Sequence, residues 1–191
     1  MKFKLLHALV VGISMSVSSM INVANAGLIF TVVEQGNDVV IEGSGNFDTN
    51  GLTIGRTGSD QGFANGSNAL AVGNTNSTDY FSVIFSGDGL FGNGGWPGHG
   101  DLHSGVFFGF DVNGLIYLPQ GYHLTVGQLL GTTTYYNSTI ASLGLLEGQY
   151  NYEVNNDTID LTIRQVPEPS TLAIFALGMM GLASRGFKEQ S

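Results

Sequence analysis

The chain has 191 residues, of which 29 are glycine and none is cysteine, and its formal net charge is −9 at pH 7. The absence of cysteine excludes disulfide bonds, thiolate nucleophiles and cysteine-ligated metal sites. Between residues 27 and 165, thirteen acidic residues face two basic ones, Arg56 and Arg164, so repulsion from phosphate groups argues against nucleic-acid binding.

Residues 1–26 have the pattern of a secretory signal peptide. Two lysines form a positive region at the start, and the apolar stretch LLHALVVGISMSV follows them. The small residues Ala24 and Ala26 then predict cleavage immediately before Gly27. We therefore expect the protein to be exported.

Short apolar stretches separated by turn residues follow, and they predict β-strands. Residues 28–33 and 38–45 flank the turn sequence EQGN and predict a hairpin. Asn50–Gly51 predicts a type I′ turn between two further stretches. Residues 80–85, YFSVIF, are β-branched and aromatic, and they predict one strand.

The second half of this region continues the same pattern. Asn113–Gly114 predicts a tight turn between residues 105–112 and 115–118. Residues 148–154 and 157–163 flank two asparagines and predict a closing hairpin, because apolar and polar residues alternate along both.

The region between the two chain ends is predicted to be an all-β domain. It lacks a helical period, and its 25 glycines favour tight turns over helices. We expect an antiparallel β-sandwich or a jelly-roll-like fold. The predicted organisation is a signal peptide over 1–26, this domain over 27–165 and a separate segment over 166–191.

The stretch from Trp96 to Gly105 holds the candidate binding residues. His99, Asp101 and His103 are spaced two apart, so an extended chain would present all three to one side as ligands for zinc or copper. Trp96 could stack on the face of a sugar ring. A flexible glycine loop with solvated histidines is the alternative.

Other chemical motifs receive a structural interpretation. Residues 87–92 fit the dinucleotide pattern G-x-G-x-x-G, but the following residues cannot form the required helix. The sequences DTNG at 48–51 and DVNG at 111–114 fit turns better than calcium loops. No motif of a known catalytic machinery is present, so we predict a non-enzymatic protein without a cofactor. A small hydrolase is the least favoured alternative.

The C-terminal segment has the pattern of a short, temporary membrane anchor. Pro167, Glu168 and Pro169 precede the apolar stretch 171–183, and a tail with basic residues follows. As a helix this stretch would rise about 20 Å, short of the roughly 30 Å hydrocarbon core of a bilayer. The prolines keep the helix from extending backwards. The segment predicts an extended tripeptide at the membrane surface that a membrane enzyme could recognise.

This arrangement resembles the PEP-CTERM sorting segment of exported proteins of Gram-negative bacteria. The resemblance implies that Pro167, Glu168 and Pro169 form the recognition site of exosortase, a membrane-embedded processing enzyme. It also implies a link to exopolysaccharide and biofilm production. The tail departs from the usual tight arginine cluster, because its basic residues are scattered and Glu189 lies among them.

The domain itself also resembles a common kind of short PEP-CTERM protein. Tyr152 stands where such proteins frequently have tryptophan. The matching motifs are Asp38-Val39-Val40, Ser86-Gly87-Asp88 with Phe91-Gly92, Leu118-Pro119 with Gly121-Tyr122, and Ala141-Ser142-Leu143-Gly144-Leu145 with Gly148 and Tyr150.

Together these features predict an exported structural protein of the cell surface or extracellular matrix. It would cross the inner membrane, be anchored there transiently, be processed by exosortase and then reach the surface or matrix, in contact with extracellular polysaccharide. A secreted carbohydrate- or metal-binding module that uses the Trp96–His103 stretch is the alternative.

Overall fold

The computed structural model describes residues 27–125 and 127–166. The predicted signal peptide with Ala24 and Ala26, the tripeptide Pro167–Pro169 and the predicted membrane helix lie outside the described residues. Within the two described ranges, no helix is long and apolar enough to cross a bilayer.

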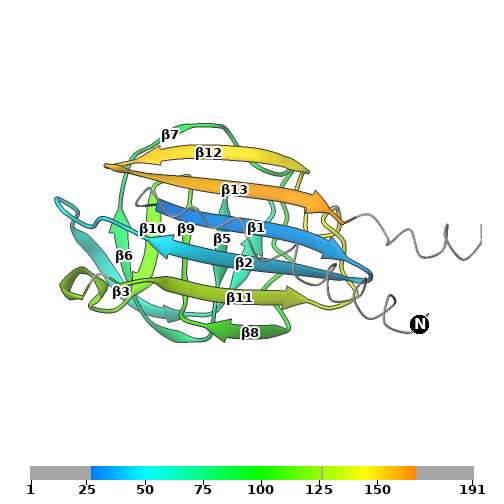
Figure 1. The fold of residues 1–191 in the computed structure, drawn as a ribbon, viewed down its shortest axis with the longest axis horizontal. Coiled ribbons are helices and arrows are strands. Elements are labelled where there is room, and N and C mark those ends of the chain that lie inside the picture. The colour runs from blue at the N-terminus through cyan, green and yellow to red at the C-terminus, as the bar shows by residue number, and fades with distance from the viewer. Residues whose placement is uncertain (1–26, 126, 167–191) are drawn as a thin grey trace, which may run out of the picture.

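The domain is all-β and consists of two sheets (Figure 1). Sheet A has seven strands, in the spatial order β7 (Phe85–Gly87), β12 (Gly148–Val154), β13 (Asp157–Gln165), β1 (Gly27–Gln35), β2 (Asp38–Asn46), β11 (Leu129–Tyr135) and β8 (Leu102–Gly105). Sheet B has six, in the order β3 (Ile54–Asp60), β6 (Asn76–Ser82), β10 (Leu115–Pro119), β9 (Phe108–Asp111), β5 (Ala69–Val72) and β4 (Phe63–Asn65). A short 3-10 helix, η1 (Tyr122–Leu124), follows β10.

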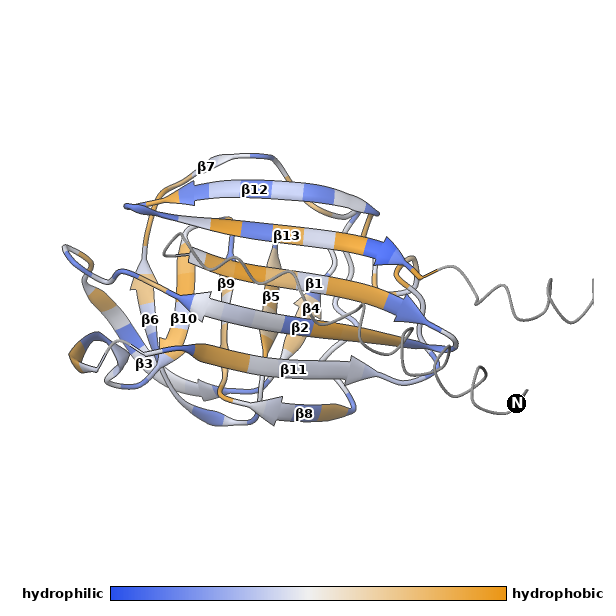
Figure 2. Cartoon of the chain, viewed as in Figure 1, coloured by the Kyte–Doolittle hydropathy of each residue, from blue (hydrophilic) through white to orange (hydrophobic). Residues whose placement is uncertain are grey.

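The two sheets pack face to face through alternate residues of their strands. In β1, Leu28, Phe30 and Val32 are fully buried, and Figure 2 shows hydrophobic and hydrophilic residues alternating along the neighbouring strand β13. The Phe30 ring lies 5.5 Å from Phe108 and 5.2 Å from Phe110 of sheet B, measured between ring centres. Each such buried phenylalanine contributes about 1.5–3 kcal/mol, so these contacts hold the sheets together.

Both hairpins predicted at the ends of the domain are confirmed. Strands β1 and β2 pair antiparallel around Gly36, whose φ of 64° is left-handed. Strands β12 and β13 pair antiparallel around Asn155, whose φ is 56°. The alternating residues of this hairpin face the core: Tyr150 is partly buried, and the others are buried, namely Tyr152, Val154, Ile159, Leu161 and Ile163. The hairpin across Asn113–Gly114 is also present, as β9 and β10.

The purely antiparallel arrangement that we expected is wrong for one pair of strands. β1 and β13 run parallel, with Gly27 opposite Thr158 and Glu34 opposite Gln165. The first and last strands of the domain therefore lie side by side in the interior of sheet A, which makes this sheet mixed.

Two local predictions also differ from the structure. Asn50–Gly51 is not a type I′ turn, because such a turn needs positive φ at both positions and only Gly51 has it, at 79°. The turn joins β2 of sheet A to β3 of sheet B, so it closes no hairpin. The stretch 80–85 is not one strand: β6 ends at Ser82 and β7 begins at Phe85, because the chain crosses from sheet B to sheet A between them.

Candidate functional site

The segment 88–101 carries Trp96, His99 and Asp101 and joins the two edge strands of sheet A, β7 and β8, and the remaining candidate, His103, lies in β8. Backbone hydrogen bonds fix its course. Asn93 N donates to Gly144 O at 2.8 Å, and Gly94 N donates to Gly66 O at 3.2 Å. Farther along, Gly100 N donates to Gly62 O at 3.2 Å. The segment is an irregular connection between strands that is anchored by these hydrogen bonds on both sides of Trp96.

Glycine is required where this segment crosses two other segments. A Cβ atom on Gly92 would overlap the carbonyl oxygens of Gly66 and Gly144. Gly144 also has a φ of 72°, a conformation that other residues adopt only with strain. This crossing accounts for two of the motifs in the resemblance, because Phe91–Gly92 and Leu143–Leu145 meet here, through the bridge between Gly92 and Leu145.

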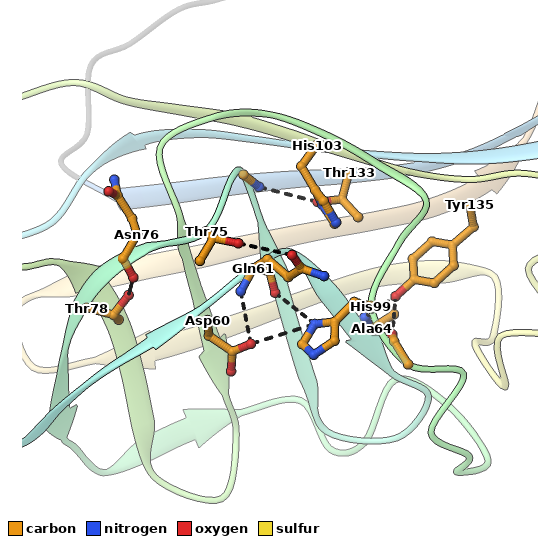
Figure 3. Close-up of polar contacts among 12 residues, drawn as sticks. Asp60, Gln61, Ala64, Thr75, Asn76, Thr78, His99, His103, Thr133 and Tyr135 are labelled. Carbon is orange, nitrogen blue, oxygen red and sulfur yellow. Dashed lines mark hydrogen bonds and ion pairs between the residues drawn. The ribbon is translucent and has the colours of Figure 1, made fainter.

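A buried tyrosine ties the segment to strand β4. The Tyr135 hydroxyl donates to Gly98 O at 2.7 Å and accepts a hydrogen bond from Ala64 N at 2.7 Å. Figure 3 shows the Tyr135 side chain directed at Ala64. Burial raises the pKa of Tyr135 to about 12, so its hydroxyl keeps its proton and both hydrogen bonds at neutral pH.

Trp96 is held in place and yet exposed. Its side chain is 58% exposed. One part of the ring packs on Phe63 at 5.3 Å between centres, and the His99 ring meets it nearly at right angles, at 83° and 5.8 Å. An indole packed against the buried Phe63 ring loses little conformational freedom when a ligand stacks on its free surface. This arrangement suits the apolar face of a sugar ring.

The support beneath Trp96 extends across the whole of sheet B. Strand pairing places one residue of each strand in a single row, in the order Phe63, Ala71, Gly109, Tyr117, Tyr80 and Arg56. The small residues in the middle let the rings of Phe63 and Tyr117 approach to 5.8 Å. At the far end, the Arg56 guanidinium lies 4.1 Å from the centre of the Tyr80 ring, a cation–π contact.

Sequence reasoning missed this aromatic row, because its members are scattered over six strands and meet only through the register of the sheet. Desolvation, followed by the nearby charge of Asp60, raises the pKa of Tyr80. Desolvation also raises the pKa of Tyr117 far above its usual value. Both hydroxyls therefore stay neutral. The row acts as a rigid support for Trp96 and does not titrate.

His99, Asp101 and His103 have different partners, and Figure 3 shows the side chains of His99 and His103 apart from each other. The Nδ1 atom of His99 lies 3.2 Å from Gln61 O and 3.6 Å from Asp60 Oδ1. Asp101 Oδ2 instead accepts a hydrogen bond from the backbone N of Tyr136, at 2.7 Å. No group of three histidine or acidic side chains in residues 27–125 and 127–166 is arranged to hold a metal ion.

His103 lies in β8 and contacts Thr133, its pairing partner in the neighbouring strand β11. Its Nδ1 lies 3.2 Å from the Thr133 hydroxyl oxygen, which also accepts a hydrogen bond from Gly73 N at 3.3 Å. Its Nε2 is buried without a hydrogen-bond partner. Desolvation is the largest effect on His103 and lowers its pKa, so the ring stays neutral and structural at pH 7.

The turn interpretation of the two aspartate motifs agrees with the geometry. Asp48 Oδ1 accepts a hydrogen bond from Asn50 N at 2.9 Å, and Asp111 Oδ1 accepts one from Asn113 N at 2.8 Å. Both are side-chain turns that stabilise the backbone locally. The segment 87–92 forms no helix either, and Asp88 Oδ2 accepts a hydrogen bond from Asn151 N at 2.8 Å.

Asp157, at the start of β13, is a perturbed group that no sequence motif indicates. The side chain is buried, Oδ2 accepts a hydrogen bond from Asp48 N, and Oδ1 has no partner. Desolvation is the largest effect on its pKa and raises it, and the Asp48 charge adds to the rise. Its hydrogen bond holds the exit of β2 against β13, so its role is structural.

Comparison with known families identifies the C-terminal segment. Residues 165–188 match the family model described as the PEP-CTERM protein-sorting motif. The chain therefore contains a PEP-CTERM motif, which indicates export, a membrane-anchored precursor and exosortase as the processing partner. No curated protein and no solved structure matches the chain.

Proposed function

We propose that this chain is a structural protein of the cell surface or extracellular matrix of a Gram-negative bacterium, delivered there by exosortase and associated with exopolysaccharide and biofilm. The observation that carries the proposal is the sorting motif at residues 165–188, which begins at the last residue of β13. A sorting signal attached directly to a folded β domain implies that the domain is the delivered cargo.

The distribution of the strands supports a removable signal at each end. All thirteen described strands lie between Gly27 and Gln165. Cleavage before Gly27 and beyond Val166 therefore removes no described strand, and the delivered product keeps both sheets. The acidic surface of this region keeps such a product soluble in a hydrated polymer matrix.

The test is the intact mass of the matrix-associated protein in strains with and without the sorting enzyme. We expect a form that begins at Gly27 and lacks the segment after Pro169, and we expect it only in the strain that has the enzyme. An unprocessed tail in both strains would contradict the proposal.

A second candidate function, carbohydrate binding, is favoured by the fixed and exposed ring of Trp96. The indole offers a flat apolar surface, and His99 packs against it together with its own partners Asp60 and Gln61, whose nitrogen and oxygen atoms can bind sugar hydroxyls. The acidic domain repels anionic polymers, so the ligand class is a neutral polysaccharide.

Trp96 is the single tryptophan of the chain, so its fluorescence reports directly on this surface. Titration with neutral oligosaccharides should quench or shift the emission. In an affinity gel, Trp96→Ala should bind about tenfold more weakly, the loss expected for one stacking contact worth about 1.4 kcal/mol. Tyr136→Ala, which removes another exposed aromatic ring, is the matched control. Equal retention of both variants would refute this second function.

A further inference from the structure

The folded domain continues up to the residue before the sorting tripeptide. The ladder between β1 and β13 is complete to the pair Glu34 and Gln165, and Val166 N still donates to Glu34 O at 3.0 Å. The next residue, Pro167, has no N–H group and cannot extend the ladder. The tripeptide therefore follows the sheet without any intervening linker.

This arrangement limits how far the tripeptide can lie from the domain. Three fully extended residues span at most about 10 Å. Adjacent strands are roughly 4.8 Å apart, so sheet A, with its seven strands, is about 30 Å wide. An enzyme that holds residues 167–169 in its active site must also accommodate the end of the domain at which β13 finishes.

That end of the domain is an ordered surface. Glu34 Oε2 accepts a hydrogen bond from Ile140 N at 2.7 Å, and Asp38 Oδ1 accepts one from Asn137 N at 3.0 Å. Ser138 N also donates to Asn37 O, at 2.8 Å. Glu34 thus binds the exit of β13 through its carbonyl group and the turn after β11 through its carboxylate.

Exposed apolar groups lie along the same end of sheet A. Val166 is 39% exposed, Leu146 is 42% exposed and Tyr136 is 47% exposed. Val166 follows β13, Leu146 lies two residues before β12 on one side of it, and Tyr136 follows β11 on the other side, beyond β1 and β2. We name Tyr136, Leu146 and Val166, with the turn 137–142, the β13-exit surface.

We propose that the β13-exit surface docks on the outward-facing surface of the membrane-embedded processing enzyme. The sorting signal is then composite, with the tripeptide in the active site and the folded end of the domain fixing its position. The inference rests on the proposed function. Its physical basis is effective concentration: because no linker separates them in the sequence, both parts of the signal reach the enzyme at once.

The first test uses the full-length chain with a ten-residue glycine–serine linker inserted between Val166 and Pro167. Loss of the sorting segment is followed by pulse-chase and intact mass. We expect processing to slow about tenfold, because the linker dilutes the second contact. The control carries the same linker after Asn113, in the β9–β10 turn, and should keep the original rate. A linker variant processed as fast as this control, or faster, would overturn the composite signal.

The second test changes the surface and leaves the connection intact. The double variant Tyr136→Ser, Leu146→Ser should be processed several-fold more slowly. Its control is Ile84→Ser, Leu124→Ser, two residues 89% and 76% exposed elsewhere on the domain. Thermal melting of all variants separates a docking defect from misfolding. Equal processing rates for the two double variants would contradict the proposal.

Two outcomes separate this inference from the proposed function. If the unaltered chain keeps its tail in every strain, exosortase sorting itself fails. If the unaltered chain is processed and the linker variant matches its control, sorting stands and only the docking surface is rejected.

Discussion

Replacing Tyr135 with phenylalanine removes a hydroxyl group that joins the Trp96 segment to strand β4. The ring itself remains, so the packing of the core is preserved. Two groups lose a hydrogen bond: the Ala64 N–H and the Gly98 carbonyl oxygen, each 2.7 Å from the hydroxyl oxygen. Ala64 is fully buried, so water cannot reach its N–H, whereas Gly98 is partly exposed and its carbonyl can be hydrated.

The expected loss follows from this asymmetry. A buried N–H left without a partner costs about 1–3 kcal/mol, and the hydrated carbonyl adds little. We expect Tyr135→Phe to lower the free energy of unfolding by about 2 kcal/mol, roughly a 30-fold change in the folding equilibrium. Because the hydroxyl also anchors Gly98, two residues beyond Trp96, the indole should become more mobile.

The assay is urea unfolding of a chain that comprises residues 27–166, which contains all the described strands. Trp96 fluorescence reports on the segment, and circular dichroism reports on the sheets. Tyr136→Phe is the control, because this neighbouring tyrosine is 47% exposed. A loss below about 0.5 kcal/mol for Tyr135→Phe, equal to that of the control, would refute the claim that the hydroxyl anchors the segment.

Three further predictions concern the core and its buried titratable groups. Gly43→Ala would bring a Cβ within 2.8 Å of Phe30 Cε1 and of Val72 Cγ2. We therefore expect the free energy of unfolding, measured in urea, to fall by about 1–3 kcal/mol. An unchanged value would mean that the sheets can move apart at no cost. Burial raises the pKa of Asp157, so its charged form opposes folding above that pKa. Asp157→Asn should raise the free energy of unfolding at pH 7. This gain should vanish as the pH falls below about 4, the usual aspartate pKa. A gain that does not depend on pH would exclude ionisation of Asp157 as its cause. Desolvation lowers the pKa of His103, so the free energy of unfolding should decrease as the pH falls below about 6.5. His103→Gln should remove this part of the pH dependence. An unchanged dependence of unfolding on pH in the variant would contradict the assignment to His103.

The features that could be predicted from the sequence are those that depend on patterns among neighbouring residues. The closing hairpin is evident from the alternation in residues 148–154 and 157–163, because every second side chain faces the core. The class of fold follows from the abundance of such stretches. The split at residues 83–84 could not be predicted, because both flanking stretches are good strands and only the crossing between sheets separates them.

The candidate site shows the same limit. Trp96 was identified from its residue type alone, and the structure leaves 58% of it exposed. The divergence of His99 and His103 depends on partners at Gln61 and Thr133, about 30 or more residues away, so an extended spacing of two carried no information on their direction. The aromatic row beneath Trp96 depends on the register of six strands, which local patterns do not specify.

The parallel pairing of β1 with β13 has a consequence for secretion. A chain that leaves the translocon N-terminus first presents β1 at once, but its partner β13 emerges only when nearly the whole domain has passed. Sheet A therefore stays unfinished, and the chain stays easy to thread, until residue 165 is outside. The sorting motif at residues 165–188 follows β13 directly in the sequence, so the fold can close only when this motif is the next part of the chain to emerge. The order of the strands therefore couples completion of the domain to the arrival of its sorting motif.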